Sequence, residues 1–417
     1  MARVPRAGGL AAIAIVMTMA GSLGTVAPAQ AAPGDLTTLS TDTFQDATTV
    51  SPNWMKPSGS NVACLTASGN TSQLPIPGCQ TTALDTPGSG ALRLTPALNT
   101  QVGTVYSTVS LPTAQGLSIK FNTYQYGNAS RADGIAFILA ATNPANPSAP
   151  ATTGPSGGAL GYASGPALTP PANGVAYGYL GFGLDVFGNF VNRTAVGGSN
   201  CSGDQAASTA VRDSIAVRGP GNGLNGYCLL ARTTVGNQGL DRPSSSARPA
   251  PVPVEIALNP SATAATTEGG LSVPANSWVM RVGGYNSMHT LSGALPSMAG
   301  IAPAGWLDGA GRPYQLTFGW AGSTGGSTEV HEINTLAAET VNGKLPAYAL
   351  AIGDNQNGQF LTGGNAVVSV TPSLDPDEGP EPEAATVTTT FPAGIVPPSA
   401  PFSTNGYTCT VSGQVVS

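Results

Sequence analysis

The chain of 417 residues has little charge of either sign. Only 9% of its residues are charged, whereas about 25% is usual for globular domains. Its three lysines are Lys56, Lys120 and Lys344, and acidic residues outnumber Lys plus Arg by 21 to 15. Because no basic cluster is present to neutralise a phosphate backbone, nucleic acid is not expected as a partner.

Long apolar runs, helical periodicity and metal-binding cysteine pairs are also missing. No stretch approaches the ~20 apolar residues that cross a bilayer, and no window shows sustained 3.6-residue periodicity with helix caps. The absence of any CxxC motif argues against thiol-ligated zinc. The chain is therefore expected to be neither helical nor inserted in a membrane.

The N-terminus has the pattern of an export signal. Arg3 and Arg6 precede the apolar run 10–20, and Ala29–Ala31 supplies the small-x-small site that signal peptidase recognises. We expect cleavage after Ala31, which places the mature protein outside the membrane, secreted or at the cell surface. The mature chain keeps 13 basic and 21 acidic side chains, a net charge of −8, which disfavours anionic lipid surfaces.

Five cysteines occur in a chain bound for an oxidising compartment, where thiols usually pair. Pairing Cys64 with Cys79 and Cys201 with Cys228 closes short loops at little cost in closure entropy. We therefore predict these two disulfides. Cys409 remains without a partner.

Apolar residues alternate with polar ones in several short segments, as in half-buried strands. Such segments are 117–121, 252–258 and 314–320, and 135–140 is a continuous apolar run typical of a central strand. With 55 Gly and 36 Pro between strands, the pattern predicts an all-β fold, a sandwich of two antiparallel sheets. Segments 141–176 and 234–251 are expected to be long surface loops.

A second β-module is predicted after Leu345. Alternation resumes at 348–352 and 368–370, and the acidic segment 375–383 is interpreted as a solvated connection. The runs VTTTFPAGI (387–395) and YTCTVSGQVVS (407–417) resemble the Ig-like repeat of bacterial surface proteins. The resemblance implies that 346–417 begins a partial Ig-like β-sandwich, truncated before the cysteine that would pair with Cys409.

Three separated segments resemble the legume-type (L-type) lectin family, here in a bacterial form. They are ADGIAFIL (132–139), LGFGLDVFGNF (180–190) and FGWAGSTGGSTEVHE (318–332), with GSGALRLT (88–95) upstream and GGALG (157–161) between. Their order and spacing cover about residues 40–343. The resemblance implies a concanavalin-like jelly-roll sandwich over 32–345 that binds glycans or glycoconjugates.

The resemblance assigns Asp133 as the aspartate that accepts hydrogen bonds from two sugar hydroxyls. It also implies that the Ala132–Asp133 peptide is cis. Taken alone, an Asp-Gly pair favours a turn that caps a strand, and that alternative stays open.

The segment 180–190 is implied to hold Ca²⁺, which prefers carboxylate, amide and carbonyl oxygens. The matching ligands are the Asp185 carboxylate, the Phe187 carbonyl and the Asn189 amide oxygen, with the Asn189 NH₂ and the Phe187 ring turned to the sugar. Asn192 is the nearest donor for a fourth ligand, and Asp204 lies beyond it. The alternative is that Asp185 is a buried strand residue bonded to loop amides.

The sequence departs from the plant pattern at the transition-metal site. Gly183 and Ser214 stand where the family has a glutamate and a histidine, so Mn²⁺ is not expected. Gly326 and Ser327 match the specificity loop, and Gly158 matches a backbone donor opposite it, where glycine lets the main chain approach a ligand. His331 is interpreted as structural.

Three other readings compete with a calcium-dependent, non-catalytic lectin or adhesin. A glycosidase needs two carboxylates about 5 to 9.5 Å apart, but Gly183 and Phe187 are the same-face neighbours of Asp185, and Glu329 and Glu332 are expected on opposite faces. The run GPSGG (154–158) fits G-x-S-x-G yet lies in a Pro-rich loop, not between a strand and a helix. A structural adhesion module that has lost sugar binding is the main alternative.

Overall fold

The computed structural model describes most of the chain in two compact units. One unit spans Leu36–Asn342, and the other combines Gly343–Ser417 with the described part of Met1–Asp35. Residues outside the description are 1–10, 17–35, 60–61, 199–200, 202–206, 360–361, 375–386, 399–401 and 405–406. Most of the predicted signal peptide and Asp204 fall in these ranges, so the leader and its cleavage site remain predictions.

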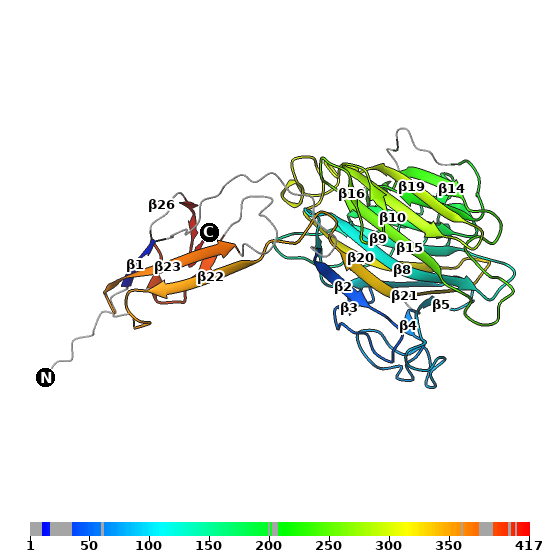
Figure 1. The fold of residues 1–417 in the computed structure, drawn as a ribbon, viewed down its shortest axis with the longest axis horizontal. Coiled ribbons are helices and arrows are strands. Elements are labelled where there is room, and N and C mark those ends of the chain that lie inside the picture. Colours follow the sequence, from blue (N-terminus) through cyan, green and yellow to red (C-terminus); the bar gives the residue numbers. More distant parts are fainter. Residues whose placement is uncertain are drawn as a thin grey trace. The chain divides into compact units, whose positions relative to one another are not determined.

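A ten-stranded antiparallel sheet forms one layer of the larger unit (Figure 1). Its main path runs β13-β12-β10-β9-β20-β6-β3, with β11 and β14 continuing from β10 and β7 pairing with β20. The bounds are β3 Trp54–Met55, β6 Val102–Ser107, β7 Leu111–Pro112, β9 Gly134–Ala141, β10 Gly178–Asp185, β11 Ser214–Arg218, β12 Gly221–Asn222, β13 Asn225–Gly226, β14 Leu229–Thr234 and β20 Gln315–Ser323.

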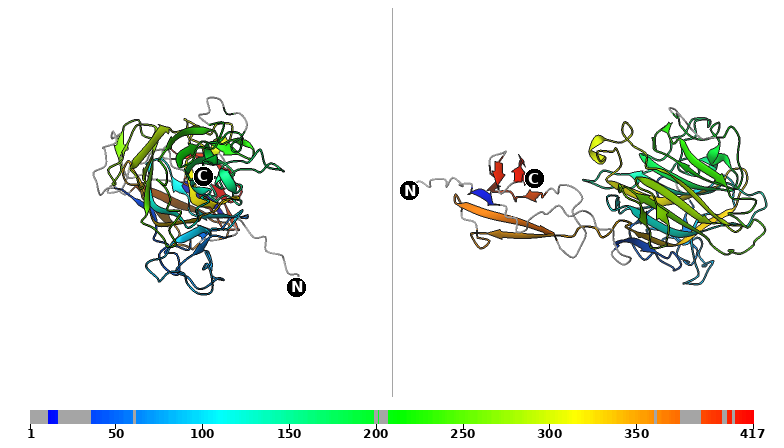
Figure 2. Two further views of the ribbon diagram at one scale, coloured as in Figure 1. Left: turned by 90° about the vertical axis from the view of Figure 1, so that its right-hand side faces the viewer. Right: turned by 45° about the horizontal axis from the view of Figure 1, so that its top comes forward.

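An eight-stranded antiparallel sheet forms the second layer, packed against the first (Figures 1 and 2). Its order is β19-β18-β15-β8-β21-β5-β4, with β2 also paired to β21. The bounds are β2 Thr38–Asp42, β4 Cys64–Leu65, β5 Leu92–Thr95, β8 Leu117–Tyr126, β15 Val252–Asn259, β18 Ser277–Gly283, β19 Met288–Ala294 and β21 Val330–Glu339. A small hairpin, β16 (Ala265–Thr266) with β17 (Ser272–Val273), forms a separate two-stranded sheet, and its Val273 packs with Ala257 and Val279 of the eight-stranded sheet. The predicted all-β jelly-roll sandwich is thus confirmed.

Aromatic residues fill the space between the sheets. Phe121 on β8 lies 5.5 Å from Trp320 on β20 and 5.4 Å from Phe137 on β9, measured between ring centroids. Phe182 on β10 meets Trp278 on β18 edge to face at 5.9 Å. These side chains alternate with outward-facing residues along their strands, as the period-two pattern predicts.

A second apolar cluster covers the outer face of the ten-stranded sheet. Ala136 and Ile138 on β9 point into it, together with Leu160 and Tyr162. Strand β9 is therefore buried on both faces, which explains its continuous apolar run. The expectation that 141–176 is a surface loop is wrong for this part, because Leu160 and Tyr162 are fully buried against the sheet.

Helices in the described residues are limited to three single 3₁₀ turns. They are η1 (Gly157–Ala159), η2 (Asn189–Val191) and η3 (Ala304–Trp306). Within the same residues no helix has the length and apolar character to span a membrane. Two of the turns carry residues assigned to the sugar site, since η1 contains Gly158 and η2 begins at Asn189.

The structure contains the two predicted disulfides. Cys64 on β4 pairs with Cys79, and Cys201 pairs with Cys228 just before β14. Cys409 is free and buried, on β27 (Tyr407–Cys409).

The smaller unit is also built of strands. Strands β22 (Tyr348–Asp354), β23 (Asn365–Leu374), β1 (Ala11–Val16) and β25 (Ile395–Val396) form one sheet. Two smaller sheets contain β24 (Thr389–Thr390), β28 (Val411–Ser412) and β29 (Val415–Val416), and β26 (Phe402–Thr404) with β27. The alternation near 350 and 368 thus marks real strands, and an Ig-like repeat stays a prediction.

Candidate functional site

The pairing of β9 with β10 brings together the two aspartates of the predicted site. In the antiparallel register Gly134 lies opposite Asp185, so the start of β9 meets the end of β10. Asp133, which immediately precedes β9, is therefore a neighbour of Asp185. Both are buried, with exposed fractions of 4% and 0%.

The main chain of Asp133 is hydrogen-bonded to the end of β20 and to the loop after β10. The Ala132–Asp133 peptide is cis, as the resemblance implies. The Asp133 N–H donates to the Ser323 carbonyl at 2.8 Å, and its carbonyl accepts from the N–H groups of Val186 at 3.0 Å and Phe187 at 3.2 Å. The side-chain Oδ2 is buried without a hydrogen-bond partner among the described residues, so it retains an acceptor for a ligand.

Asp185 orders the loop that follows β10. Its Oδ1 accepts from the Gly188 N–H and its Oδ2 from the Phe190 N–H, both at 2.6 Å. These bonds fold 186–190 back over the carboxylate and lead into η2. Asp185 is therefore hydrogen-bonded to loop amides, as the alternative interpretation of the sequence expected. Each carboxylate oxygen keeps a further lone pair that a cation can use.

Burial raises the pKa values of both carboxylates. Burial, followed by the charge of Asp185, raises the pKa of Asp133 to about 8. Burial also raises the pKa of Asp185 to about 7, with a contribution from Asp213, although backbone N–H groups oppose it. A cation beside these groups would relieve the repulsion. The unpartnered Asp133 oxygen and the oxygen donors around Asp185 fit Ca²⁺, which the Asp185 and Asn189 side chains and the Phe187 carbonyl would hold.

Gly158 and Asn189 are in direct contact, although they are far apart in sequence. A Cβ added to Gly158 would lie 2.2 Å from the Asn189 Cβ, so only glycine allows η1 and η2 to approach this closely. Two residues that the resemblance assigns to the sugar site are thus brought together, and the absence of a side chain at Gly158 leaves its main chain open to a ligand.

The loop after β20 borders the same site at Gly325. A Cβ at Gly325 would lie 3.2 Å from Asp133 Oδ2 and 4.0 Å from the Gly157 Cα, whereas a Cβ at Gly326 would meet nothing within 4 Å. The Ser323 hydroxyl donates to the Gly157 carbonyl at 3.1 Å. Gly325 is therefore a site residue that sequence reasoning missed, although its pairing with Gly326 was a signal for it.

Phe187 has a neighbour that the sequence did not reveal. The Arg212 guanidinium lies over the Phe187 ring, 4.7 Å from the ring centroid. Arg212 is exposed, and no carboxylate in the described residues pairs with it. One face of the ring assigned to sugar stacking is therefore covered by a cation, which leaves the other face and the edge for a ligand.

The fourth calcium ligand has two candidates. The Asn192 Oδ1 accepts from the Thr194 N–H at 3.0 Å and hydroxyl at 2.7 Å, while its NH₂ donates to the Asn189 Oδ1 at 3.2 Å. Asp213, just before β11, lies close enough to raise the pKa of Asp185. A carboxylate neutralises Ca²⁺ better than an amide, but the Asp213 carboxylate is already paired with Arg131, so Asn192 and Asp213 both remain candidates.

Arg131 joins the sugar-site loop to two acidic residues. Its Nε donates to Asp241 Oδ2 at 2.5 Å and its Nη2 to Asp241 Oδ1 at 2.9 Å, and Nη2 also pairs with Asp213. A further bond of 3.2 Å runs from Nη1 to Asn237 Oδ1. Because Arg131 is two residues from Asp133, this network holds the loop in place. Nothing in the local sequence indicated it.

The described residues contain no group of three or more His, Cys, Asp or Glu side chains suited to a metal ion. The predicted calcium set has a single carboxylate and so differs from such a group.

At the predicted transition-metal positions, Gly183 packs against the Phe190 ring, where a Cβ would lie 2.5 Å from Cδ1. Ser214 lies opposite Asp185 on β11.

Behind the site lie other buried polar side chains. His331 is fully buried and its Nδ1 lies 2.6 Å from the Thr95 hydroxyl, and burial lowers its pKa to about 3. Burial and the Asp241 carboxylate raise the pKa of Glu329 to about 9. Glu332 is held by Arg93 and Arg248. His331 therefore lies in the interior, as interpreted from the sequence.

Ser156, in the run that fits G-x-S-x-G, is not placed as a nucleophile elbow. It precedes the three-residue turn η1 and has an extended backbone, with φ −69° and ψ 176°. The nearest preceding strand, β9, ends at Ala141. A strand-to-helix turn that exposes the hydroxyl is thus not formed here.

The fold is similar to solved lectin structures. The exoplasmic/lumenal domain of VIP36, in a Ca²⁺/Man3GlcNAc-bound form, is 13% identical with a TM-score of 0.38, over 69% of this chain and 86% of that one. Lectin I-B4 from Griffonia simplicifolia, in metal-free form, is 13% identical with a TM-score of 0.41, over 72% and 100%. The Bauhinia forficata lectin in complex with GalNAc is 14% identical with a TM-score of 0.41, over 74% and 100%. No model of a known protein family and no curated protein sequence matches this chain. At these identities and TM-scores the likeness shows neither a family nor a function for this chain.

Proposed function

We propose that this protein is a secreted or cell-surface lectin that binds glycans with the help of Ca²⁺ and does not catalyse their hydrolysis. The observation that carries the proposal is the convergence of three loops on the buried Asp133 carboxylate. Gly158 touches Asn189, Gly325 lies against Asp133 Oδ2, and that oxygen has no partner among the described residues.

The donors and acceptors of this site match the hydroxyl groups of a sugar. An ionised Asp133 would accept from two hydroxyls, the Asn189 NH₂ would donate to one, and main-chain N–H groups at Gly158, Gly326 and Ser327 would donate to others. Glycines at 158 and 326 let the ligand approach the backbone.

Calcium would act on the sugar site indirectly. An ion held by Asp185, Phe187, Asn189 and either Asn192 or Asp213 would keep Asp185 ionised and orient the Asn189 amide toward the ligand. Its charge would also lower the pKa of Asp133, which burial, followed by the charge of Asp185, raises to about 8. Without such an ion Asp133 would carry a proton at neutral pH, and a protonated Asp133 accepts fewer hydrogen bonds.

An extracellular location is supported by the two disulfides, which form in oxidising compartments. The predicted leader 1–31 and a partial Ig-like module at 346–417 complete the proposed organisation, in which the lectin unit is displayed by a surface repeat. A structural module without sugar binding remains the competing hypothesis.

A glycan array with the purified secreted chain tests the proposal, run with calcium and again with a chelator. We expect binding to one class of glycan that is lost on chelation. Asp133→Ala should abolish that binding while the protein stays folded. Thr408→Ala, a change in the other unit, serves as the matched control and should bind like the parent.

Each other result has a defined meaning. Binding that survives chelation would support the lectin function and contradict the proposed calcium ligands. Binding that survives Asp133→Ala would place the sugar elsewhere, and no binding in either condition would favour the structural module. Release of reducing sugar from a bound glycan would overturn the non-catalytic assignment.

A further inference from the structure

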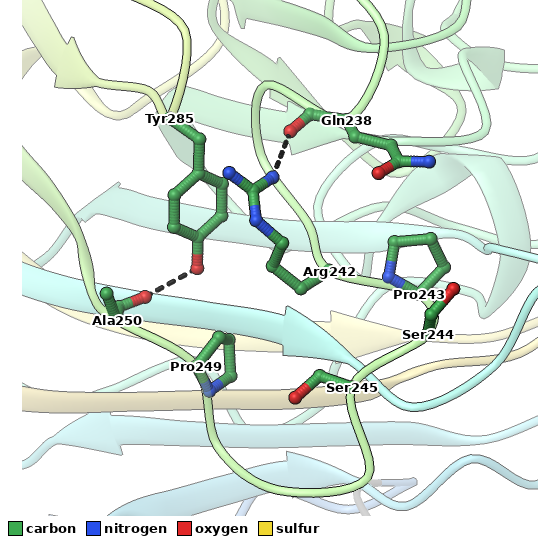
Figure 3. Close-up of a pocket in the computed structure, with 8 residues that line it drawn as sticks. All are labelled: Gln238, Arg242, Pro243, Ser244, Ser245, Pro249, Ala250 and Tyr285. Atoms are coloured by element: carbon green, nitrogen blue, oxygen red, sulfur yellow. Dashed lines mark hydrogen bonds between the residues drawn. The ribbon is translucent and has the colours of Figure 1, made fainter.

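A cavity lined by both polar and apolar groups lies outside the loops that surround Asp133. It has a volume of about 500 Å³ and is formed by the segment between β14 and β15 together with the turn between β18 and β19 (Figure 3). Its lining includes Gln238, Arg242, Pro243, Ser244, Ser245 and Tyr285. A cavity of this volume has the size of a small-ligand site.

Arg242 is held rigidly in this cavity. Its guanidinium stacks on the Tyr285 ring, 3.4 Å from the centroid, and its Nη1 donates to the carbonyls of Gln238 at 2.7 Å and Asp241 at 2.8 Å. The Tyr285 hydroxyl in turn donates to the Ala250 carbonyl at 2.5 Å (Figure 3). A guanidinium fixed in this way loses little conformational entropy when it binds a ligand.

The charge of Arg242 is not neutralised by a side chain in the described part of the protein. The neighbouring carboxylate of Asp241 pairs with Arg131 instead, and the nearby Arg248 pairs with Asp85 and Glu332. Nε and Nη2 of Arg242 donate to no acceptor in the described residues. These two groups form the planar edge that binds a carboxylate with two parallel hydrogen bonds.

The rest of the lining suits a hydroxyl-rich ligand. The Ser245 hydroxyl donates to the Ala247 carbonyl at 2.6 Å and keeps its capacity to accept, while Ser244 is exposed and Gln238 offers a side-chain amide. The rings of Pro243 and Pro249 supply apolar surface for the C–H face of a sugar. One cation among hydroxyl and amide groups indicates a ligand with one acidic group and several hydroxyls.

We propose that this cavity binds the carboxylate-bearing unit of an acidic saccharide, with Arg242 as the carboxylate ligand. The site is separate from the one at Asp133 and contains no calcium ligand. Binding here therefore needs neither Asp133 nor Ca²⁺, and it stands or falls independently of the lectin site.

Saturation-transfer NMR on the full secreted chain in the presence of chelator tests the proposal. The probes are D-glucuronate, its neutral match D-glucose, and acetate as a carboxylate without hydroxyls. We expect transfer to glucuronate, far less to glucose and to acetate, and weaker binding at high salt because the contact is charge-assisted. Asp133→Ala should leave glucuronate binding unchanged.

Arg242→Gln keeps a planar amide on Tyr285 and removes the charge, so it should weaken glucuronate binding about tenfold or more. Lys120→Gln, which removes a positive charge paired with Glu339 and Glu268 elsewhere, is the matched control and should bind like the parent. Thermal melts identify a variant that fails to fold, and Arg242→Lys then provides a milder change with the same expected direction. Unchanged glucuronate binding in folded Arg242→Gln would overturn the proposal, as would equal binding of glucose or of acetate.

Discussion

At the scale of single residues, Gly158 shows how closely η1 and η2 approach each other. The position of an added Cβ, 2.2 Å from the Asn189 Cβ, is far inside van der Waals contact. A side chain at 158 would therefore push η1 and η2 apart, and Asn189 would move with η2.

We predict that Gly158→Ala lowers stability by about 1 to 3 kcal/mol, as overpacking does, and reduces glycan affinity more strongly than Gly309→Ala. The control has open space around its Cβ position. Chemical denaturation and glycan titration measure the two effects. Equal behaviour of the two variants would contradict the observed contact.

Glu329 is a buried residue whose protonation affects stability. It is fully buried, and burial together with Asp241 raises its pKa from 4.5 to about 9. Between these values the folded protein keeps a proton that the unfolded chain has released. The stabilisation is thus complete below about pH 4.5 and is lost as the pH rises through about 9.

We predict that Glu329→Gln, which cannot ionise, flattens the dependence of unfolding free energy on pH. Relative to the parent, the variant should gain on the order of 5 kcal/mol between about pH 5 and pH 9. Urea denaturation across this range measures the difference. Glu268→Gln, on an exposed side chain, is the control, and parallel curves for parent and Glu329→Gln would refute the buried proton.

At the scale of elements, the loop between β8 and β9 depends on Arg131 for its position. The guanidinium pairs with Asp213 at the start of β11 and with the fully buried Asp241 after β14. Three segments that are distant in sequence are thus joined at one end of the sandwich, next to Asp133.

We predict that Arg131→Met destabilises the protein by about 3 to 5 kcal/mol, because it leaves buried carboxylates without a counter-charge. Removal of the exposed Lys120 pair should cost less than about 1 kcal/mol. Adding Asp241→Asn to Arg131→Met should restore part of the loss, and a double-mutant cycle by denaturation measures it. If the second change brought no recovery, the ion pair would not be the cause.

At the scale of the whole molecule, the proposed calcium site links ligand binding to stability. An ion that binds only the folded protein adds about 2.7 kcal/mol at one hundred times its dissociation constant. We predict that calcium raises the Tm of the larger unit by several degrees relative to chelator, whereas magnesium has a smaller effect because it demands stricter geometry.

Differential scanning calorimetry measures this shift for the parent and for Asp185→Asn. The variant should lose the response to calcium, since Asp185 supplies the carboxylate that the proposed ligand set contains with either fourth ligand. A calcium response of the same size in the variant would rule out Asp185 as a ligand. The absence of any response in the parent would rule out the proposed calcium site.

The sequence by itself determined the features that depend on short stretches of chain. Alternation at 117–121 and 252–258 predicted strands because burial of one face of a strand selects every second residue. The pairs Cys64–Cys79 and Cys201–Cys228 followed from short loop closure in an oxidising compartment. The resemblance at 132–139 also anticipated the cis peptide before Asp133.

Only the tertiary structure decided the contacts between segments that are far apart in the chain. No pattern in the local sequence indicates that Arg131 pairs with Asp241 or that Arg212 lies over Phe187. The local sequence does not indicate the burial of Leu160 and Tyr162 on the ten-stranded sheet either. Each depends on the order of strands in the sheets, which sets which loops meet at one end of the sandwich. Local residue spacing specifies a strand and its buried face, whereas strand order is specified by the packing of the whole core.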